Sequence, residues 1–239
     1  YYMNPPAKDL SKIASSDKVK KVQKDFEATH VRPERLMKTL FTDEAYVKAN
    51  VDEARLMRRL FDLACNMQSH DTDMQLYSLF TDEECYDLWS CNNLYWYLTH
   101  ACSPVTDGLM PYREADLLRN ILDRADAALK EGKNQATLRF GHESCLLPLV
   151  ALLELNHYGE SYPDVEKLSE QWRAYDIFPM ASNVQFVFFH KKGSNDVLVK
   201  VLLNEKEAKL PVKTDVAPYY HWKDVESYYR EKLDKYQHI

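Results

Sequence analysis

The stretch at residues 136–153, ATLRFGHESCLLPLVALL, constrains the fold more than any other part of the sequence. Its first part, Ala136–Gly141, follows a polar break and leads into an apolar run, so we expect a buried strand, a tight turn and a helix. Proline keeps all helix hydrogen bonds intact only among the first four residues, because the amides there have no partner inside the helix. Pro148 therefore predicts that the helix begins at Cys145 or later. The residues left on the turn are His142, Glu143 and Ser144.

This turn brings a histidine and a carboxylate to a position suited to an anion. Free amides and the positive end of the helix dipole favour negative charge at a helix start. The end of a strand is also where α/β proteins place their sites. Two alternatives stay open, because His142 could be a core histidine bonded to backbone and Ser144 could be a helix cap. Asn183, before the next predicted strand, could reach the same site or serve only as a turn residue at the strand start.

Two common hydrolase motifs are excluded around this turn. A zinc protease motif that begins at His142 needs a second histidine four residues later, where the chain has Leu146. A serine hydrolase of the α/β type needs G-x-S-x-G, which does not occur in the sequence.

Composition limits the classes of partner. The 239 residues are 45% hydrophobic and 28% charged, with a net charge of −6, which allows one large or two small domains with a core. A duplex nucleic-acid binder usually carries a basic face, and a membrane helix needs roughly 18 to 20 apolar residues, so neither is expected. A small phosphorylated substrate is still possible, because an acidic protein can hold a local basic pocket. Candidates for that pocket are Lys191, Lys192, Arg139 and Arg173.

The cysteines predict no metal site. There are five, and none forms a C-x-x-C pair, so a zinc ribbon or a thioredoxin-like pair is not indicated. A bridge such as Cys85 to Cys91 stays open.

Helical patterns dominate the first half, where only one of the five glycines occurs. Thr81 and Glu84 have the spacing of a capping box, which predicts a helix from there to about His100. This helix is rich in aromatic residues, which suit either core packing or one wall of a substrate cleft. Apolar spacing predicts the other helices at Lys8–Ala28, Glu34–Leu40, Val51–Met67, 111–132, 163–175 and His221–Tyr236. Valine-rich and phenylalanine-rich runs predict two strands, Val184–His190 and Val197–Leu203, joined as a hairpin through KKGSND.

At His142, Glu143 and Ser144 the chain resembles the histidine acid phosphatases, in the branch of the phytases and multiple inositol polyphosphate phosphatases. Members carry a His-Asp or a His-Ala-Glu motif after a core strand. A second block, IFPMASNVQFVFFH at 177–190 followed by VLVKVLLNE at 197–205, is similar to the paired strands after that motif. The resemblance covers the C-terminal half well and the N-terminal half loosely. It implies an α/β fold with a helical cap domain at 1–110 and the C-terminal part of a phosphoglycerate-mutase-like histidine phosphatase core at 111–239.

The resemblance also implies a reaction. Inositol polyphosphates such as phytate would lose phosphate through a phosphohistidine, without a metal or another cofactor. His142 would hold phosphoryl oxygens and Glu143 would protonate the leaving alkoxide, while Ser144 and Arg139 would bind substrate. The His-Asp pattern places the acid at Glu143, whereas the His-Ala-Glu pattern places it at Ser144.

The nucleophile of the family lies in an Arg-His-Gly-x-Arg segment near the start of its members. No histidine of this chain is followed by glycine. The chain opens YYMNPPAKDL, without a methionine start or the features of a signal peptide, and we expect it to be a fragment. The N-terminal half of the same protein would then supply the nucleophile, and the isolated chain would be inactive. The resemblance implies a periplasmic or secreted location.

A non-enzymatic function is the alternative. The chain could be a helical interaction module with a degenerate phosphatase-like tail. This alternative predicts no phosphate affinity at His142 and an exposed apolar patch on the helix at 81–100.

Overall fold

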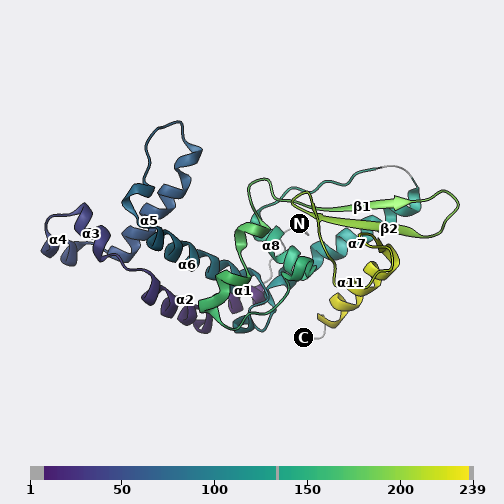
Figure 1. The fold of residues 1–239 in the computed structure, drawn as a ribbon. Coiled ribbons are helices and arrows are strands. Elements are labelled where there is room, and N and C mark those ends of the chain that lie inside the picture. The colour runs from purple at the N-terminus through teal and green to yellow at the C-terminus, as the bar shows by residue number, and fades with distance from the viewer. Residues whose placement is uncertain (1–7, 133–134, 237–239) are drawn as a thin grey trace. The chain divides into compact units, whose positions relative to one another are not determined.

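The computed structural model describes residues 8–132 and 135–236, and it divides into two compact units (Figure 1). The helical unit is Lys20–Tyr95, and the mixed unit is Tyr1–Val19 with Trp96–Ile239. The sequence predicted a boundary between residues 110 and 111, which would separate the helical cap domain of the family from its phosphatase core. That boundary stays a prediction.

In the helical unit the structure describes helices and the loops between them. Its elements are the greater part of α2 (Asp17–His30), α3 (Glu34–Leu40), α4 (Glu44–Asn50), α5 (Glu53–Asn66), the 3-10 helices η1 (Met67–Ser69) and η2 (Tyr77–Leu79), and most of α6 (Asp82–His100). The single helix predicted at Lys8–Ala28 was wrong, because α1 (Lys8–Ala14) ends before α2 begins. Serine side chains compete for backbone bonds at this break: the Ser15 hydroxyl donates to the Ser11 carbonyl, and the Ser16 hydroxyl accepts from the Val19 amide.

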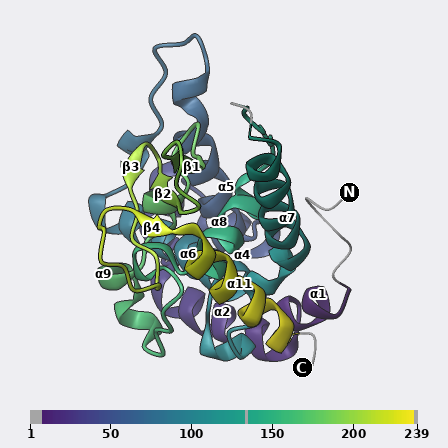
Figure 2. The same ribbon diagram turned by 90° about the vertical axis from the view of Figure 1, so that its right-hand side faces the viewer.

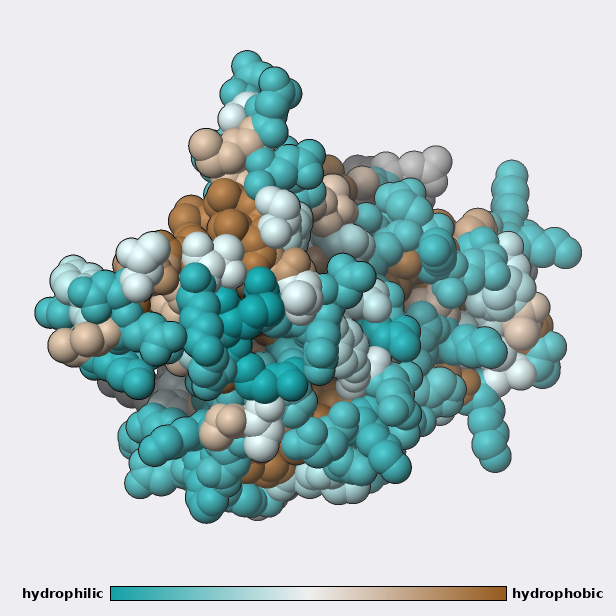
Figure 3. All heavy atoms as spheres, turned by 60° about the vertical axis from the view of Figure 1, so that its left-hand side comes forward, coloured by the Kyte–Doolittle hydropathy of each residue, from teal (hydrophilic) through white to brown (hydrophobic). Residues whose placement is uncertain are grey.

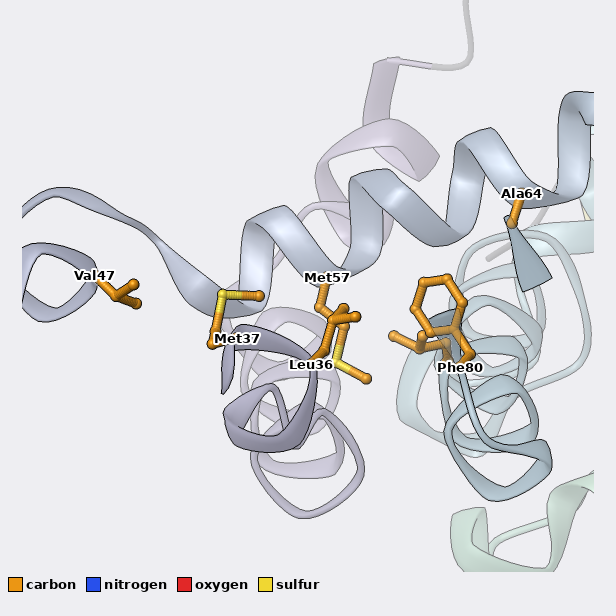
Figure 4. Packing of buried hydrophobic residues seen from close by; sticks show 7 residues of the cluster. Leu36, Met37, Val47, Met57, Ala64 and Phe80 are labelled. Atoms are coloured by element: carbon orange, nitrogen blue, oxygen red, sulfur yellow. The ribbon is translucent and has the colours of Figure 1, made fainter. Parts of the chain in front are cut away.

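A compact apolar cluster holds the helical unit together (Figure 4). Leu36 of α3 and Met57 of α5 are fully buried, and Phe80, the residue directly after η2, belongs to the same cluster. Helices as short as α3 and α4 are marginal in isolation, so this packing is what makes them stable.

The predicted capping box at the start of α6 is confirmed. The Glu84 amide donates to the Thr81 hydroxyl at 3.2 Å, and the Thr81 amide donates to the Glu84 carboxylate at 2.9 Å. Arg35 of α3 binds both carboxylate oxygens of Glu84, through Nε at 2.7 Å and Nη2 at 2.5 Å. The hydrogen bond from Arg35 lowers the pKa of Glu84. One carboxylate therefore caps α6 and joins it to α3.

Replacing Thr81 with alanine should lower the stability of the helical unit by about 1 kcal/mol, because the Glu84 amide loses its acceptor. Urea denaturation followed by circular dichroism measures this change. Ser78→Ala is the matched control, since the exposed Ser78 hydroxyl bonds only to the Gln75 carbonyl. Equal losses in the two variants would contradict the role of the cap.

The mixed unit contains the predicted hairpin. Strands β1 (Val184–His190) and β2 (Val197–Leu203) pair antiparallel with the predicted bounds, and Phe186 lies opposite Val201. Two short strands also pair with β2, namely β3 (Lys206–Glu207) and β4 (Tyr220–His221). Val199 and Val201 are fully buried, so one face of β2 belongs to the core.

The other elements of the mixed unit are helices. They are α1, η3 (Pro104–Thr106), η4 (Met110–Glu114), α7 (Ala115–Glu131), α8 (Glu143–Leu152), η5 (Leu155–His157), η6 (Val165–Lys167), α9 (Leu168–Gln171), α10 (Ala174–Ile177) and α11 (Trp222–Tyr236). Gly132 ends α7 with φ +65°, as predicted for a glycine after a helix. The segment at 163–175 forms three short pieces instead of one helix, with Leu168 and Trp172 buried.

Helix α11 joins β2 and α7 (Figure 2). Its Arg230 binds Asp126 of α7 at 2.8 Å and Asp123 at 2.9 Å, while Trp222 donates to Asp126 at 2.8 Å. The Trp222 ring also meets Phe188 of β1 edge-on, with centroids 4.9 Å apart. The last helix therefore fixes the sheet against α7.

The surface is more polar than the cores of the two units. The face in Figure 3 is mostly hydrophilic, with hydrophobic atoms in separate patches. Within the described residues, every helix is too short or too polar to cross a bilayer.

Candidate active site

Helix α8 begins at Glu143, so the predicted start at Cys145 or later was wrong. Pro148 lies inside the helix, where its missing amide leaves the Ser144 carbonyl without the usual helix bond. The apolar run explains the outcome, because Leu147, Leu149 and most of their neighbours in α8 are buried. Burial of one such side chain contributes about 1.5 to 3 kcal/mol. Several of them together outweigh a proline in a helix, which costs about 3 kcal/mol.

The predicted strand before α8 is also not formed. Residues 135–142 make no strand pairing in the described chain, and Leu138 and Phe140 are 75% and 86% exposed. A strand needs a neighbour for its backbone hydrogen bonds, and none of the described strands lies there to supply them. The prediction of a buried strand was therefore wrong for this chain.

Arg139 points to the opposite side of this segment. Its Nη2 donates to the Asn120 side chain of α7 at 2.8 Å, whereas its buried Nε has no hydrogen-bond partner. Successive side chains alternate in extended backbone, so Arg139 rests on α7 while Leu138 and Phe140 face away. The structure thus anchors the predicted substrate-binding arginine three residues before His142.

The three predicted site residues form the start of α8. His142 is the N-cap residue, and its carbonyl accepts from the amides of Cys145 at 3.0 Å and Leu146 at 3.1 Å. His142 and Glu143 are exposed and Ser144 is half-buried, so the alternative of a core histidine is excluded. Ser144 lies inside the first turn and is not the cap. The amides of Glu143 and Ser144 have no hydrogen-bond partner among the described residues, which leaves two donors for an anion.

Beneath this turn lies a buried carboxyl group that the sequence did not reveal. Glu114, the last residue of η4, is 2% exposed and hydrogen-bonds to the Cys145 side chain. Burial raises the pKa of the Glu114 carboxyl to about 7, and Arg113 opposes this shift only in part. Burial likewise lowers the pKa of His100 to about 4, with a contribution from Arg113.

Side chains of α11 hold the other end of α8. The Tyr229 hydroxyl donates to the Leu153 carbonyl at 2.7 Å, and the Lys232 ammonium donates to the Leu152 carbonyl at 2.7 Å. Tyr229 is fully buried. These contacts satisfy carbonyls that a helix end leaves unpaired, so α8 is fixed at both ends.

The remaining sequence candidates lie elsewhere. The Asn183 amide donates to the Asn204 side chain at 3.1 Å, which fits its alternative as a turn residue at the strand start. Arg173 donates to the Ser169 carbonyl at 2.8 Å, and the exposed Lys191 and Lys192 lie on the hairpin connection.

All five cysteines are free, and each lies among the described residues. The bridge considered between Cys85 and Cys91 is absent. Both residues lie on α6, and six residues along a helix rise about 9 Å, which exceeds the span of a disulfide. In the part of the chain that the structure describes, no three His, Cys, Asp or Glu residues come together as a metal site.

The family model of the histidine phosphatase superfamily (branch 2) matches residues 1–204. The chain belongs to this superfamily, and the predicted fold class is confirmed.

Individual relatives agree with this assignment. Human multiple inositol polyphosphate phosphatase 1 is 28% identical over 134 residues, which cover 51% of this chain and 27% of the relative. The crystal structure of the Bifidobacterium longum multiple inositol polyphosphate phosphatase with phosphate is similar over 94% of this chain, with a TM-score of 0.64 at 19% identity. Its complex with inositol hexasulfate is similar over 91%, with a TM-score of 0.59 at 19% identity. The chain spans 55% and 53% of those solved chains, respectively.

Proposed function

We propose that this chain is the acid half of an inositol polyphosphate phosphatase. The observation that carries the proposal is the exposed His142–Ser144 segment at the start of α8, with two unpaired amides, in a chain of this superfamily. The similar proteins are named as inositol polyphosphate phosphatases, and one was solved with phosphate and with inositol hexasulfate. The substrate would therefore be a phosphorylated inositol, and the rest of a longer polypeptide would complete the site.

The reaction would proceed in two phosphoryl transfers. A histidine of an Arg-His-Gly segment outside this chain attacks phosphorus, and the bond to the inositol oxygen breaks. His142 and the free amides of the first turn hold the phosphoryl oxygens, where they stabilise developing charge. Glu143 donates a proton to the leaving alkoxide, and water then releases phosphate from the phosphohistidine.

The non-catalytic alternative gains no support from α6. Tyr86 and Tyr95 are its large exposed aromatic residues, at 51% and 45%. Tyr95 follows Tyr86 by nine positions, which is about two and a half turns at 3.6 residues per turn. The two residues therefore lie on opposite sides of the helix. They therefore form no continuous apolar patch of the kind that a docking helix needs.

Phosphate release from inositol hexakisphosphate tests the proposal. The longer polypeptide should turn over, and the 239-residue chain alone should not, because it lacks the nucleophile. His142→Ala in the longer polypeptide should lower kcat/KM by at least about 10²-fold, the usual cost of losing one oxyanion donor. His157→Ala is the matched control, because the His157 side chain is 75% exposed and pairs only with Glu160.

One result would contradict this division of the site. Turnover by the 239-residue chain that disappears on His142→Ala would place the nucleophile within this chain.

A further inference from the structure

Glu114 occupies an unusual place for a carboxyl group. It ends η4 and precedes α7, yet its side chain does not cap α7. The residue is 2% exposed, and its side chain turns toward α8, where it hydrogen-bonds to Cys145. Its Oε2 is buried and has no hydrogen-bond partner. Helices η4 and α8 pack against each other, so this carboxyl group lies directly beneath the first turn of α8.

Few charges act on this group. Among the residues that the structure describes, Arg113, next to it on η4, is the cation that favours its ionisation, and Cys145 of α8 is its hydrogen-bond partner. The other elements packed on η4 are α1, α7 and α11, whose Tyr236 ring stacks on the Tyr112 ring of η4 with centroids 4.2 Å apart. The acids Asp9 of α1 and Asp116 of α7 are exposed to solvent. A buried carboxylate that keeps one oxygen unpaired is costly, because its charge loses water without gaining a full set of partners.

We propose that Glu114 is a positioning residue for His142, Glu143 and Ser144, holding the first turn of α8 on η4 while neutral and releasing it when ionised. This inference rests on the proposed function, which assigns the three residues of that turn to the active site. Cys145 transmits the effect, because it contacts Glu114 and directly follows the three site residues.

The direction of the effect follows from proton linkage. Burial raises the pKa of Glu114 from 4.5 in the released state to about 7 in the packed state. The released state therefore binds fewer protons, and its population grows as the pH rises from about 4.5 to about 7. Above that pH the carboxyl group is ionised in both states, so the population no longer changes.

Thiol labelling of Cys145 measures the release on the chain itself. Cys145 is 8% exposed in the packed state, so a soluble aromatic disulfide reaches it only when the first turn opens. Mass spectrometry of the Cys145 peptide gives its labelling rate in the presence of the other four cysteines. Each rate is divided by the rate in the urea-unfolded chain at the same pH, which removes the ionisation of the thiol itself.

The normalised rate should rise tenfold or more between about pH 5 and about pH 7 and then level off, since one pKa unit corresponds to a tenfold change. Glu114→Gln keeps the shape and removes the ionisation, so its rate should stay flat. Asp116→Asn, at the exposed first turn of α7, should keep the rise. A flat profile in the unsubstituted chain, or an equal rise in Glu114→Gln, would overturn the proposal.

Activity separates this inference from the proposed function. In the longer polypeptide, Glu114→Gln should keep kcat for inositol hexakisphosphate at a pH where the unsubstituted enzyme has lost it, with KM little changed. A pH-dependent labelling profile together with no phosphatase activity in either form would support the positioning role and overturn the proposed function.

Discussion

Glu143→Gln, made in the longer polypeptide, is expected to slow hydrolysis of inositol hexakisphosphate by about 10²- to 10⁴-fold, the usual contribution of a general acid. An inositol alkoxide is a poor leaving group and needs a proton in the transition state. Glu143 is the exposed first residue of α8, so its carboxyl group can reach a substrate oxygen held at the helix start. Glutamine keeps the size of the side chain and removes the proton.

The leaving group provides the internal control for Glu143. A nitrophenolate departs without protonation, so hydrolysis of p-nitrophenyl phosphate should be nearly unchanged in Glu143→Gln. Steady-state kinetics on both substrates measures the difference. Equal losses on both would mean that Glu143 only shapes the site.

Ser144→Ala decides between the two family patterns. The His-Ala-Glu pattern places the acid at position 144, but a serine hydroxyl is too weak an acid to protonate an alkoxide leaving group near neutral pH. We therefore expect a modest loss that is similar for both substrates. A loss in Ser144→Ala confined to inositol hexakisphosphate would move the assisting group to Ser144.

Local sequence signals predicted much of the fold. The hairpin was found with its bounds because valine and phenylalanine runs flank a glycine-containing connection, and pairing within one hairpin needs no distant partner. The capping box at Thr81 and the stop at Gly132 were found because both act within a few residues. The sequence placed His142 and Glu143 on a turn before a helix, whereas in the structure His142 is the N-cap and Glu143 is the first residue of α8. Their roles remain predictions.

Errors arose where packing between distant segments decides the structure. Pro148 predicted a later start for α8, but burial of the surrounding leucines outweighs the lost hydrogen bond. Glu114 gave no signal, because a glutamate before a helix is ordinary and its burial comes from the packing of η4 against distant elements, α8 above all. The strand at Ala136–Gly141 was predicted from its own residues, whereas its formation depends on a neighbouring strand.

The second large effect that we expect is on stability, and it concerns the predicted strand at Ala136–Gly141. We expect Leu138→Ala and Phe140→Ala each to destabilise the longer polypeptide by about 2 to 5 kcal/mol, the usual cost of truncating a buried large side chain. In the 239-residue chain the same changes should alter stability by less than about 0.5 kcal/mol, because both side chains face solvent. Urea denaturation of both proteins measures the contrast. Met180→Ala, at a residue that is 97% exposed in this chain, is the control for an exposed apolar side chain.

The difference between the two proteins is informative because α7 already holds the segment at 136–141 from one side. Arg139 fixes it to Asn120 of α7, so Leu138 and Phe140 share the face that a neighbouring sheet layer would cover. A strand added beside 136–141 would supply the missing backbone partners, and a layer packed on the face of that sheet would bury both side chains. The end of the added strand would then lie next to His142. We expect the nucleophilic histidine of the proposed reaction at this position, where it could share a phosphoryl group with the start of α8. Small effects of Leu138→Ala and Phe140→Ala in both proteins would show that no strand pairs there, and the nucleophile would have to approach His142 from another side.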